Sequence, residues 1–394
     1  MHSKFSALKL QVKDELTQNI LPFWLDKMTD QRSGFYGQIN GNNQLIESAD
    51  KGGILNARIL WTFSSAYLHL KNPLYLAAAN RAQEYILSHF FDNEWGGTYW
   101  SVTADGNPAE TKKQIYAQAF FIYALSEHYR ATGDKTSLEK AIELFHLIEK
   151  YSFDAIQYGY FEAYSHDWKL LDDLRLSAKD ANEKKTMNTH LHILEAYTNL
   201  YRVWKNEKLE AQLENLILIF TDKIVNPSTH HLGLFFDENW VSKSNTVSYG
   251  HDIEAAWLIE EAARVLGNSG LLMKVQQICT GVAEAACEGL QPDGSLIYEF
   301  DPDKNHTDYD RHWWVQAEAV VGFLNTYELT GDPVWFERAE KCWQYIDKNL
   351  VDKEKGEWFW SIRADGSVNR DDDKAGFWKC PYHNSRMCFE AMMR

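Results

Sequence analysis

Apolar residues recur nearly all round six segments of the chain, the pattern of helices that are buried on every side. The segments are 54–70, 114–133, 187–204, 249–267, 313–331 and 382–393. Between them lie segments such as 74–91 and 137–153, which show clearer charged faces. This second pattern is typical of helices with one face toward solvent. The alternation of the two patterns predicts an inner and an outer layer of helices.

A short stretch rich in glycine, aromatic and turn-forming residues precedes each of the six buried segments. Such stretches are typical of β-hairpins. They are 34–47, 94–110, 158–171, 231–245, 294–308 and 356–371. Several helical segments also end in glycine followed by Asp or Asn, as at Gly133-Asp134, Gly267-Asn268 and Gly331-Asp332. Glycine in that place is a common helix stop.

The repeating unit is therefore an outer helix, a hairpin and an inner helix, with a period of about 60–70 residues. Six helix pairs that close into a ring form an (α/α)6 barrel, so the predicted fold class is all-α, with twelve helices and short β-hairpins in the connecting loops. An open solenoid would need polar capping repeats at its ends, and none is visible. No linker rich in Pro, Gly or Ser divides the chain, which predicts a single catalytic domain over residues 1–394.

The net charge of the chain disfavours two classes of binding partner. The formal net charge is −16, and both nucleic acids and anionic membranes require a basic surface. No segment approaches the ~20 apolar residues of a membrane span, and the N-terminus lacks the apolar stretch of a signal peptide. The five cysteines include no CxxC pair, which favours free thiols. We expect a cytoplasmic monomer with a small-molecule substrate, no nucleic acid and no membrane partner.

Polar or aromatic side chains with potential chemistry lie near the start of every buried helix. Because six separated segments send them toward one end of the barrel axis, they predict a shared site. The helix N-termini would also favour negative charge there, which suits a reaction through an anionic intermediate. The side chains are Arg58, Tyr116, Gln118, Asn188, His192, His251, Glu254, Trp314, Glu318 and His383.

Three chemistries compete for this site. A metal centre would draw on the histidines and Glu254, but the HExxH signature is absent, and no metal is expected. Glycoside hydrolysis needs two carboxylates that flank the scissile bond, with Glu254, Glu318 and Asp180 as candidates, but it leaves the three histidines unexplained. Proton transfer on a sugar uses histidines naturally, because their ordinary pKa of about 6.5 suits both acid and base roles.

Five motifs across the chain carry a resemblance to a known family. The sequence resembles the cellobiose 2-epimerases, a branch of the N-acylglucosamine 2-epimerase superfamily. The motifs are "NARILWTFSSAY" (56–67), "RLSAKDANEKKTMNTHLHILEAYT" (175–198), "SYGHDIEAAWL" (248–258), "HWWVQAEAVVG" (312–322) and "GFWKCPYHNSRMCFE" (376–390). They cover five of the six repeats.

The resemblance implies that the reducing-end glucose of a β-1,4-linked disaccharide becomes mannose by inversion at its second carbon, without a cofactor. Cellobiose would give glucosyl-mannose, and lactose would give epilactose. By motif, His251 and His383 are the acid/base pair at the second carbon, and His192 assists ring opening. Arg58 would stabilise the oxygen of a cis-enediolate.

The resemblance also implies a set of substrate contacts. Tyr116, Asn188 and Glu318 would hold sugar hydroxyls, and Glu254 would orient His251. Two tryptophans, Trp314 and Trp378, match positions that stack on sugar rings, and Asp180 lies in a loop that can contact the non-reducing sugar. His190 is expected to be structural, because it points away from His192.

Two further interpretations stay open. A mannose 2-epimerase or mannose isomerase on the same scaffold would share the enediolate intermediate, and the two reactions differ in where the proton returns. A non-catalytic sugar-binding barrel would keep the two tryptophans but would not need three histidines.

Overall fold

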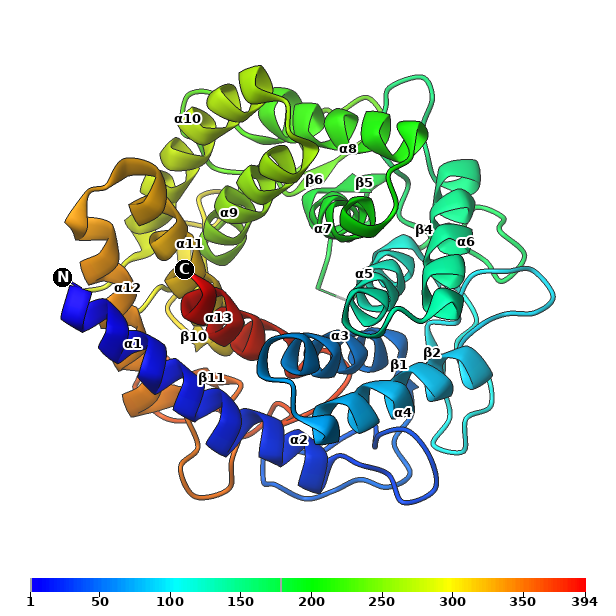
Figure 1. The fold of residues 1–394 in the computed structure, drawn as a ribbon. Helices are drawn as coiled ribbons and strands as arrows, with labels where there is room; N and C mark the ends of the chain where they lie inside the picture. The colour runs from blue at the N-terminus through cyan, green and yellow to red at the C-terminus, as the bar shows by residue number, and fades with distance from the viewer. Residues whose placement is uncertain (1, 178) are drawn as a thin grey trace.

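Two concentric layers of helices form a closed ring in the computed structural model, which describes residues 2–177 and 179–394 (Figure 1). The inner layer consists of α3 (Gly53–Leu70), α5 (Ile115–Thr132), α7 (Met187–Val203), α9 (Tyr249–Leu266), α11 (Trp313–Thr330) and α13 (Tyr382–Met393). The outer layer consists of α1 (His2–Glu15) and α2 (Leu21–Lys27), joined by the π-helical turn Leu16–Ile20, then α4 (Pro73–His89), α6 (Lys135–Tyr151), α8 (Glu207–Ile219), α10 (Ser269–Ala286) and α12 (Pro333–Tyr345). The predicted (α/α)6 barrel is confirmed.

Short strands connect each repeat to the next one. A short strand precedes each of the first five inner helices. It pairs with a strand of the next hairpin, which comes after that inner helix and the following outer helix, as where Lys51 faces Val102. The pairs are β1 (Lys51–Gly52) with β2 (Ser101–Val102), β3 (Lys113–Gln114) with β4 (Ala163–Tyr164), β5 (Lys185–Thr186) with β6 (Phe235–Phe236), β7 (Val247–Ser248) with β8 (Glu299–Asp301), and β10 (Arg311–His312) with β11 (Ser361–Ile362). In the fourth pair, β8 also pairs with β9 (His306–Asp308) on its other edge. A bridge between Ile39 and Ala375 links the first repeat to the last and closes the ring.

The predicted helix stops are confirmed. Gly133 ends α5 with φ of 76°, a left-handed conformation that glycine adopts without steric cost. The next residue, Asp134, caps α6 because its side chain accepts from the backbone N–H of Ser137. Two residues therefore end one helix and start the next in the opposite direction.

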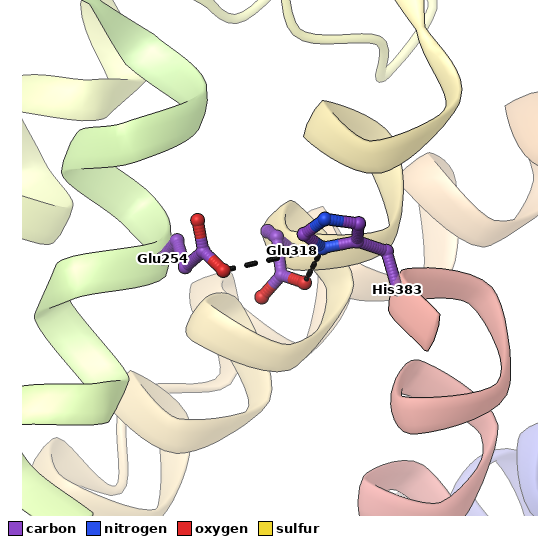
Figure 2. A group of neighbouring side chains, drawn as sticks. All are labelled: Glu254, Glu318 and His383. Carbon is purple, nitrogen blue, oxygen red and sulfur yellow. Dashed lines mark hydrogen bonds and ion pairs between the residues drawn. The ribbon is translucent and has the colours of Figure 1, made fainter. Parts of the chain in front are cut away.

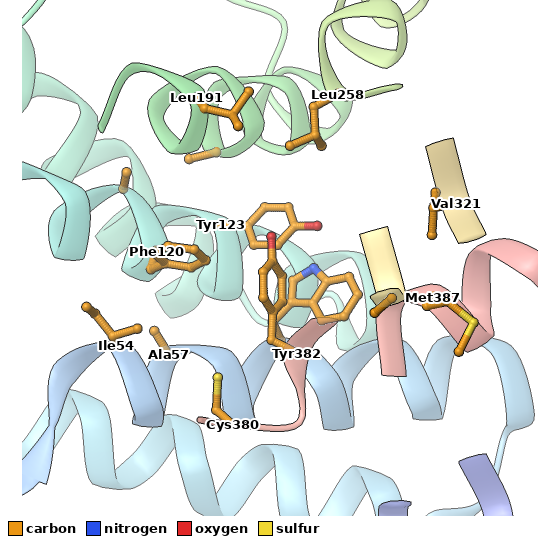
Figure 3. Close-up of a cluster of buried hydrophobic side chains, with 14 of the residues drawn as sticks. Ile54, Ala57, Phe120, Tyr123, Leu191, Leu258, Val321, Cys380, Tyr382 and Met387 are labelled. Atoms are coloured by element: carbon orange, nitrogen blue, oxygen red, sulfur yellow. The ribbon is translucent and has the colours of Figure 1, made fainter. Parts of the chain in front are cut away.

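Aromatic side chains fill part of the space inside the inner ring. Tyr123 and Tyr382 project between the helices, with Phe120 beside them (Figure 3). The indole of Trp61 stacks on Tyr123 with ring centroids 5.3 Å apart, a spacing at which aromatic pairs attract. The barrel interior is therefore a packed core, and only part of it remains for chemistry.

Lysine–aspartate pairs are buried at the base of several inner helices. In the second repeat, Lys113 lies on β3, and its ammonium group is 2.6 Å from the carboxylate of Asp92. The same arrangement occurs in the first repeat, with Lys51 and Asp30 at 2.8 Å, and in the third. Since a buried charge is costly without its partner, each pair fixes a hairpin to the start of its helix.

Replacing Lys113 by methionine should lower the free energy of unfolding by about 3–5 kcal/mol, because Asp92 stays buried without the ammonium group. Urea denaturation at pH 7 measures the loss. The double variant Lys113→Met/Asp92→Asn should recover much of it, whereas Lys169→Met, in the exposed pair with Asp167, should leave the midpoint unchanged. Equal midpoints for Lys113→Met and wild type would contradict this role.

None of the described helices combines the length and the apolar character that crossing a bilayer requires.

Candidate active site

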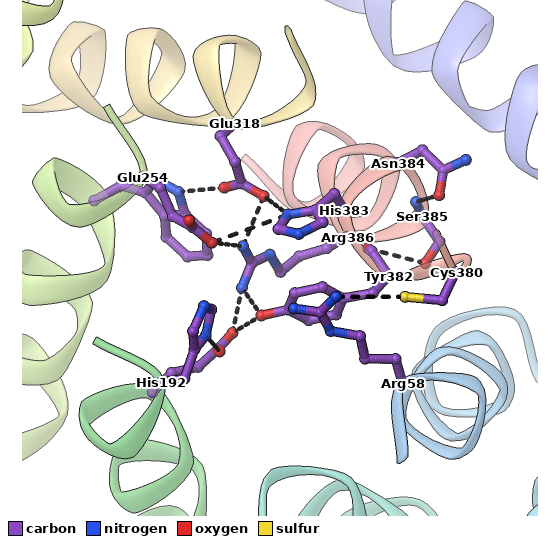
Figure 4. Close-up of polar contacts among 12 residues, drawn as sticks. Arg58, His192, Glu254, Glu318, Cys380, Tyr382, His383, Asn384, Ser385 and Arg386 are labelled. Atoms are coloured by element: carbon purple, nitrogen blue, oxygen red, sulfur yellow. Dashed lines mark hydrogen bonds and ion pairs between the residues drawn. The ribbon is translucent and has the colours of Figure 1, made fainter. Parts of the chain in front are cut away.

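One position in each inner helix faces the barrel axis. The sixth residue is Arg58 in α3, His192 in α7, Glu254 in α9 and Glu318 in α11. In α13 the fifth residue, Arg386, takes this place, and these five side chains converge from separate helices (Figure 4). In α5 the sixth residue is the aromatic Phe120, whose ring centroid is 4.7 Å from that of His192. The convergence predicted from the sequence is therefore present, with a regular structural origin.

The fourth residue of an inner helix points the other way and holds the preceding hairpin. Gln118 forms two hydrogen bonds with the backbone of Thr98, both 2.9 Å long. The prediction that Gln118 lies in the site is therefore wrong. His190 accepts from the backbone N–H of Tyr160 at 2.9 Å, which confirms its structural role. Side chains two residues apart on a helix point in different directions, which separates His190 from His192.

Arg386 is the centre of the polar network, and the sequence interpretation missed it. One terminal nitrogen, Nη2, donates to Glu254 Oε1 at 2.8 Å and to Glu318 Oε1 at 2.7 Å. The other, Nη1, donates to Glu195 and to the hydroxyl of Tyr382. One buried guanidinium thus joins three carboxylates from three helices, a geometry for which the planar fork of arginine is suited.

His383 is oriented by Glu318 (Figure 2). Its Nδ1 lies 2.6 Å from Glu318 Oε1, while the other oxygen of Glu318 accepts from Trp257 Nε1 at 3.0 Å. Because a carboxylate only accepts, Nδ1 carries a hydrogen and Nε2 is left as the proton acceptor. Burial lowers the pKa of His383 to about 3. Both oxygens of Glu318 accept hydrogen bonds from protein side chains. Glu318 is therefore placed to orient His383, whereas the sequence predicted that it would hold sugar hydroxyls.

His251 lies against the same indole as His383. The centroid of the Trp314 ring is 4.8 Å from that of His251 and 5.7 Å from that of His383. The partner of His251 Nδ1 is Ser248 Oγ at 2.8 Å. Glu254 was expected to orient His251, but its bond is to Arg386, which corrects that expectation. Burial lowers the pKa of His251 to about 3.

The guanidinium of Arg58 uses only some of its N–H groups in hydrogen bonds to described residues. Its guanidinium donates to the Tyr116 hydroxyl at 3.0 Å and to Cys380 Sγ at 3.6 Å. The rings of Phe120 and Tyr382 lie 4.2 and 4.7 Å from its central carbon. The buried Nε has no hydrogen-bond partner among the described residues. A donor of this kind can bind an oxygen that becomes negatively charged.

The remaining predicted residues lie around this centre. Trp378 is half-buried, with its ring 6.2 Å from that of Tyr116. The buried Oδ1 of Asn188 has no partner among the described residues. Burial and the charges of Glu299, Asp308 and Asp180 raise the pKa of Tyr298, whose ring is 6.2 Å from that of Trp314. Asp180 is half-buried, and its Oδ2 accepts from the backbone N–H of Ser177 at 2.8 Å.

Comparison with known proteins decides the family. The sequence model of the N-acylglucosamine 2-epimerase family matches residues 34–386. This chain belongs to the N-acylglucosamine 2-epimerase family. A cellobiose 2-epimerase of Bacteroides fragilis is 56% identical, over 98% of both chains. The structure of cellobiose 2-epimerase from Bacillus thermoamylovorans is 41% identical and has a TM-score of 0.95, covering 99% of this chain and 100% of that one. A D-mannose isomerase structure, at 19% identity and a TM-score of 0.86 over 98% of this chain and 97% of that one, shows the fold alone.

In this family member, one described group of side chains has the spacing of metal ligands. Ligand atoms of Glu254, Glu318 and His383 all lie within 4.8 Å of one another (Figure 2). The guanidinium of Arg386 donates to both carboxylates, so a cation from the protein already lies between them. The wider set proposed from the sequence for a metal, with His192 and His251, does not form such a group among the described residues.

Acid should destabilise the protein through its buried neutral histidines. Burial lowers the pKa of His190, His251 and His383 to about 3 each. Between pH 6.5 and 3 the unfolded chain therefore binds more protons than the folded one, so stability falls as pH falls, by up to about 1.4 kcal/mol per pH unit for each histidine. We expect the stability advantage of wild type over His190→Gln, measured by urea denaturation, to shrink steadily below pH 6. Parallel curves for the two proteins would contradict the shift.

Proposed function

We propose that the protein is a cellobiose 2-epimerase, which inverts the second carbon of the reducing-end glucose in β-1,4-linked disaccharides. It would convert cellobiose to glucosyl-mannose and lactose to epilactose. The observation that carries the proposal is the arrangement of His251 and His383 around one indole, that of Trp314. The imidazole of His383 is buried and that of His251 is half-buried, and each has its Nδ1 held by a neighbour. Arg58 converges on the same centre (Figure 4), and its Nε has no hydrogen-bond partner among the described residues.

The reaction begins with opening of the sugar ring, because a proton beside an aldehyde is far more acidic than one in the closed ring. His192 is buried on α7, and its Nδ1 is 2.9 Å from Glu195. The hydrogen on Nδ1 leaves Nε2 free to take the proton of the anomeric hydroxyl. The proton then passes to the ring oxygen as its bond to the first carbon breaks.

Proton exchange at the second carbon follows. One of His251 and His383 removes the proton through a neutral imidazole nitrogen. The other, which has taken up a proton from solvent, returns it to the opposite face, and the first then releases its proton to solvent. Low pKa values keep the resting base neutral at pH 7. When His383 holds the proton, the carboxylate of Glu318 at 2.6 Å stabilises its positive charge. Which histidine acts as the base depends on the direction of reaction.

The cis-enediolate between these two steps carries negative charge on oxygen. Arg58 stays protonated, and its Nε–H has no partner among the described residues. It can therefore stabilise that charge, and the guanidinium is buried. Deleting a donor of this kind in other enzymes raises the barrier by about 3–4 kcal/mol. Trp314 and Trp378 would stack on the two sugar rings, while Asn188 and Asp180 would accept from hydroxyls.

Incubation with cellobiose in heavy water, followed by NMR, tests the function. Glucosyl-mannose with deuterium at its second carbon supports the proposal. A glucosyl-fructose product with deuterium at its first carbon would favour an isomerase, and free glucose would indicate hydrolysis. An unchanged disaccharide combined with exchange on mannose would favour a mannose 2-epimerase.

The proposal includes a monomer that acts in the cytoplasm as one barrel domain without a cofactor. Light scattering during gel filtration tests the monomer. Full activity after dialysis against EDTA tests the independence from metal. Loss of activity that returns with a divalent cation would contradict it.

A further inference from the structure

Two histidine–carboxylate pairs face the centre of the barrel, and they are separate in space and in sequence. The first joins His192 to Glu195 within α7, at 2.9 Å. The second joins His383 on α13 to Glu318 on α11, at 2.6 Å. Arg386 lies between them and donates to both carboxylates. The proposed function uses the second pair at the second carbon of the sugar.

Glu195 has contacts that determine which nitrogen of His192 carries the hydrogen. Its Oε1 accepts from the Tyr382 hydroxyl and from Arg386 Nη1. The other oxygen, Oε2, is left to accept from His192 Nδ1. Glu195 and His192 are both buried, and Arg386 keeps Glu195 ionised, because it lowers the pKa of Glu195 although burial acts in the opposite direction. His192 is therefore fixed as the tautomer with a bare Nε2.

We propose that Glu195 is the positioning residue for ring opening, and that the two pairs divide the reaction: Glu195 and His192 open the sugar ring, while Glu318 and His383 exchange the proton at the second carbon. This inference rests on the proposed function. In the opening step, Nε2 accepts the anomeric hydroxyl proton, the O–H electron pair forms the C1=O1 bond, and the pair of the C1–O5 bond goes to O5. The imidazolium then gives its proton to O5, so no proton is gained or lost overall.

The variant Glu195→Gln tests the assignment because it should reverse the tautomer. Tyr382 and Arg386 both donate, so they hold the amide oxygen and turn the NH2 group toward His192. Nδ1 must then accept, and the hydrogen moves to Nε2, which can no longer act as a base. The general-base contribution to ring opening is lost.

A substrate that cannot form the ring separates the two steps. In 4-O-glucosyl-5-deoxyglucose the hydroxyl that closes the six-membered ring is missing, and the oxygen at the fourth carbon is blocked. On cellobiose, Glu195→Gln should lose at least about 100-fold in kcat, while on the open-chain analogue it should keep close to the wild-type rate. The matched variant Glu318→Gln should lose activity on both substrates. An equal loss by Glu195→Gln on both, or no loss on either, would overturn the assignment.

Nitrogen-15 NMR of the wild-type protein gives a second test that needs no variant. The resonances of His192, assigned by comparison with His192→Gln, should show a hydrogen on Nδ1 and a bare Nε2 at pH 7. A hydrogen on Nε2 would overturn the assignment even if Glu195→Gln fails to fold. Wild-type protein that is inactive on cellobiose would contradict the proposed function and leave the tautomer to be decided by this measurement.

Discussion

Replacing His383 by asparagine should lower kcat for cellobiose by about 10³-fold, within the range that a positioned acid or base contributes. The amide can still occupy the space beside Glu318 and Trp314, but it cannot take up a proton. Folding should change little, because the buried imidazole is neutral and its bond to Glu318 can be replaced. The rate of glucosyl-mannose formation, followed by NMR, measures the loss.

Deuterium exchange gives this experiment a sharper outcome. If His251 and His383 face opposite sides of the second carbon, a variant that lacks one of them can exchange the proton of only one epimer. His383→Asn and His251→Asn should therefore retain slow exchange with opposite preferences for cellobiose and glucosyl-mannose. The exposed His306 supplies the control, since His306→Asn should behave as wild type. Two variants with the same preference would contradict a pair on opposite faces.

Replacing Arg386 by methionine should destabilise the protein by about 3–5 kcal/mol at pH 7 and remove activity. The loss arises because the carboxylates of Glu195, Glu254 and Glu318 would remain buried around one apolar side chain. Urea denaturation measures the stability. Arg386→Lys should recover only part of the lost stability. The three carboxylates are arranged around a planar guanidinium, and a single ammonium group cannot contact all of them.

Arg175 provides the matched control. Its guanidinium is 2.8 Å from the carboxylate of Asp173, and both side chains are exposed, so Arg175→Met should change stability by less than about 1 kcal/mol. A similar loss in the two variants would show that Arg386 acts as an ordinary ion pair. Full activity in a folded Arg386→Met protein would separate the network from catalysis.

The repeat could be predicted from the sequence because its causes are local. A helix that is apolar all round and a hairpin with glycine and aspartate each need only a few neighbouring residues to be recognised. Helix geometry explains why Arg58, His192, Glu254 and Glu318 converge, because each is the sixth residue of its inner helix. Gln118 was misplaced because the sequence does not show which side of an inner helix faces the axis.

The roles within the site depended on contacts between helices. Arg386 stands in a motif that the sequence analysis quoted, yet an arginine near the end of a chain gives no sign that it will meet three carboxylates. The resemblance implied that Glu254 orients His251, its neighbour one helical turn away, whereas the hydrogen-bond partner of Glu254 is Arg386, 132 residues away in sequence. The spacing along one helix would allow a contact between Glu254 and His251. The attraction between the charged groups of Glu254 and Arg386, which lie on different helices, is stronger and determines the contact.

The amino-acid sequence by itself determined the period, the two layers of helices and the set of side chains available for chemistry, since periodicity and turn composition act over a few residues. Only the tertiary structure decided which strand pairs with the next repeat, which carboxylate holds which histidine, and that one guanidinium joins them. These choices depend on closing the ring, which the bridge between Ile39 and Ala375 completes, because closure sets the distances between side chains that lie far apart along the chain.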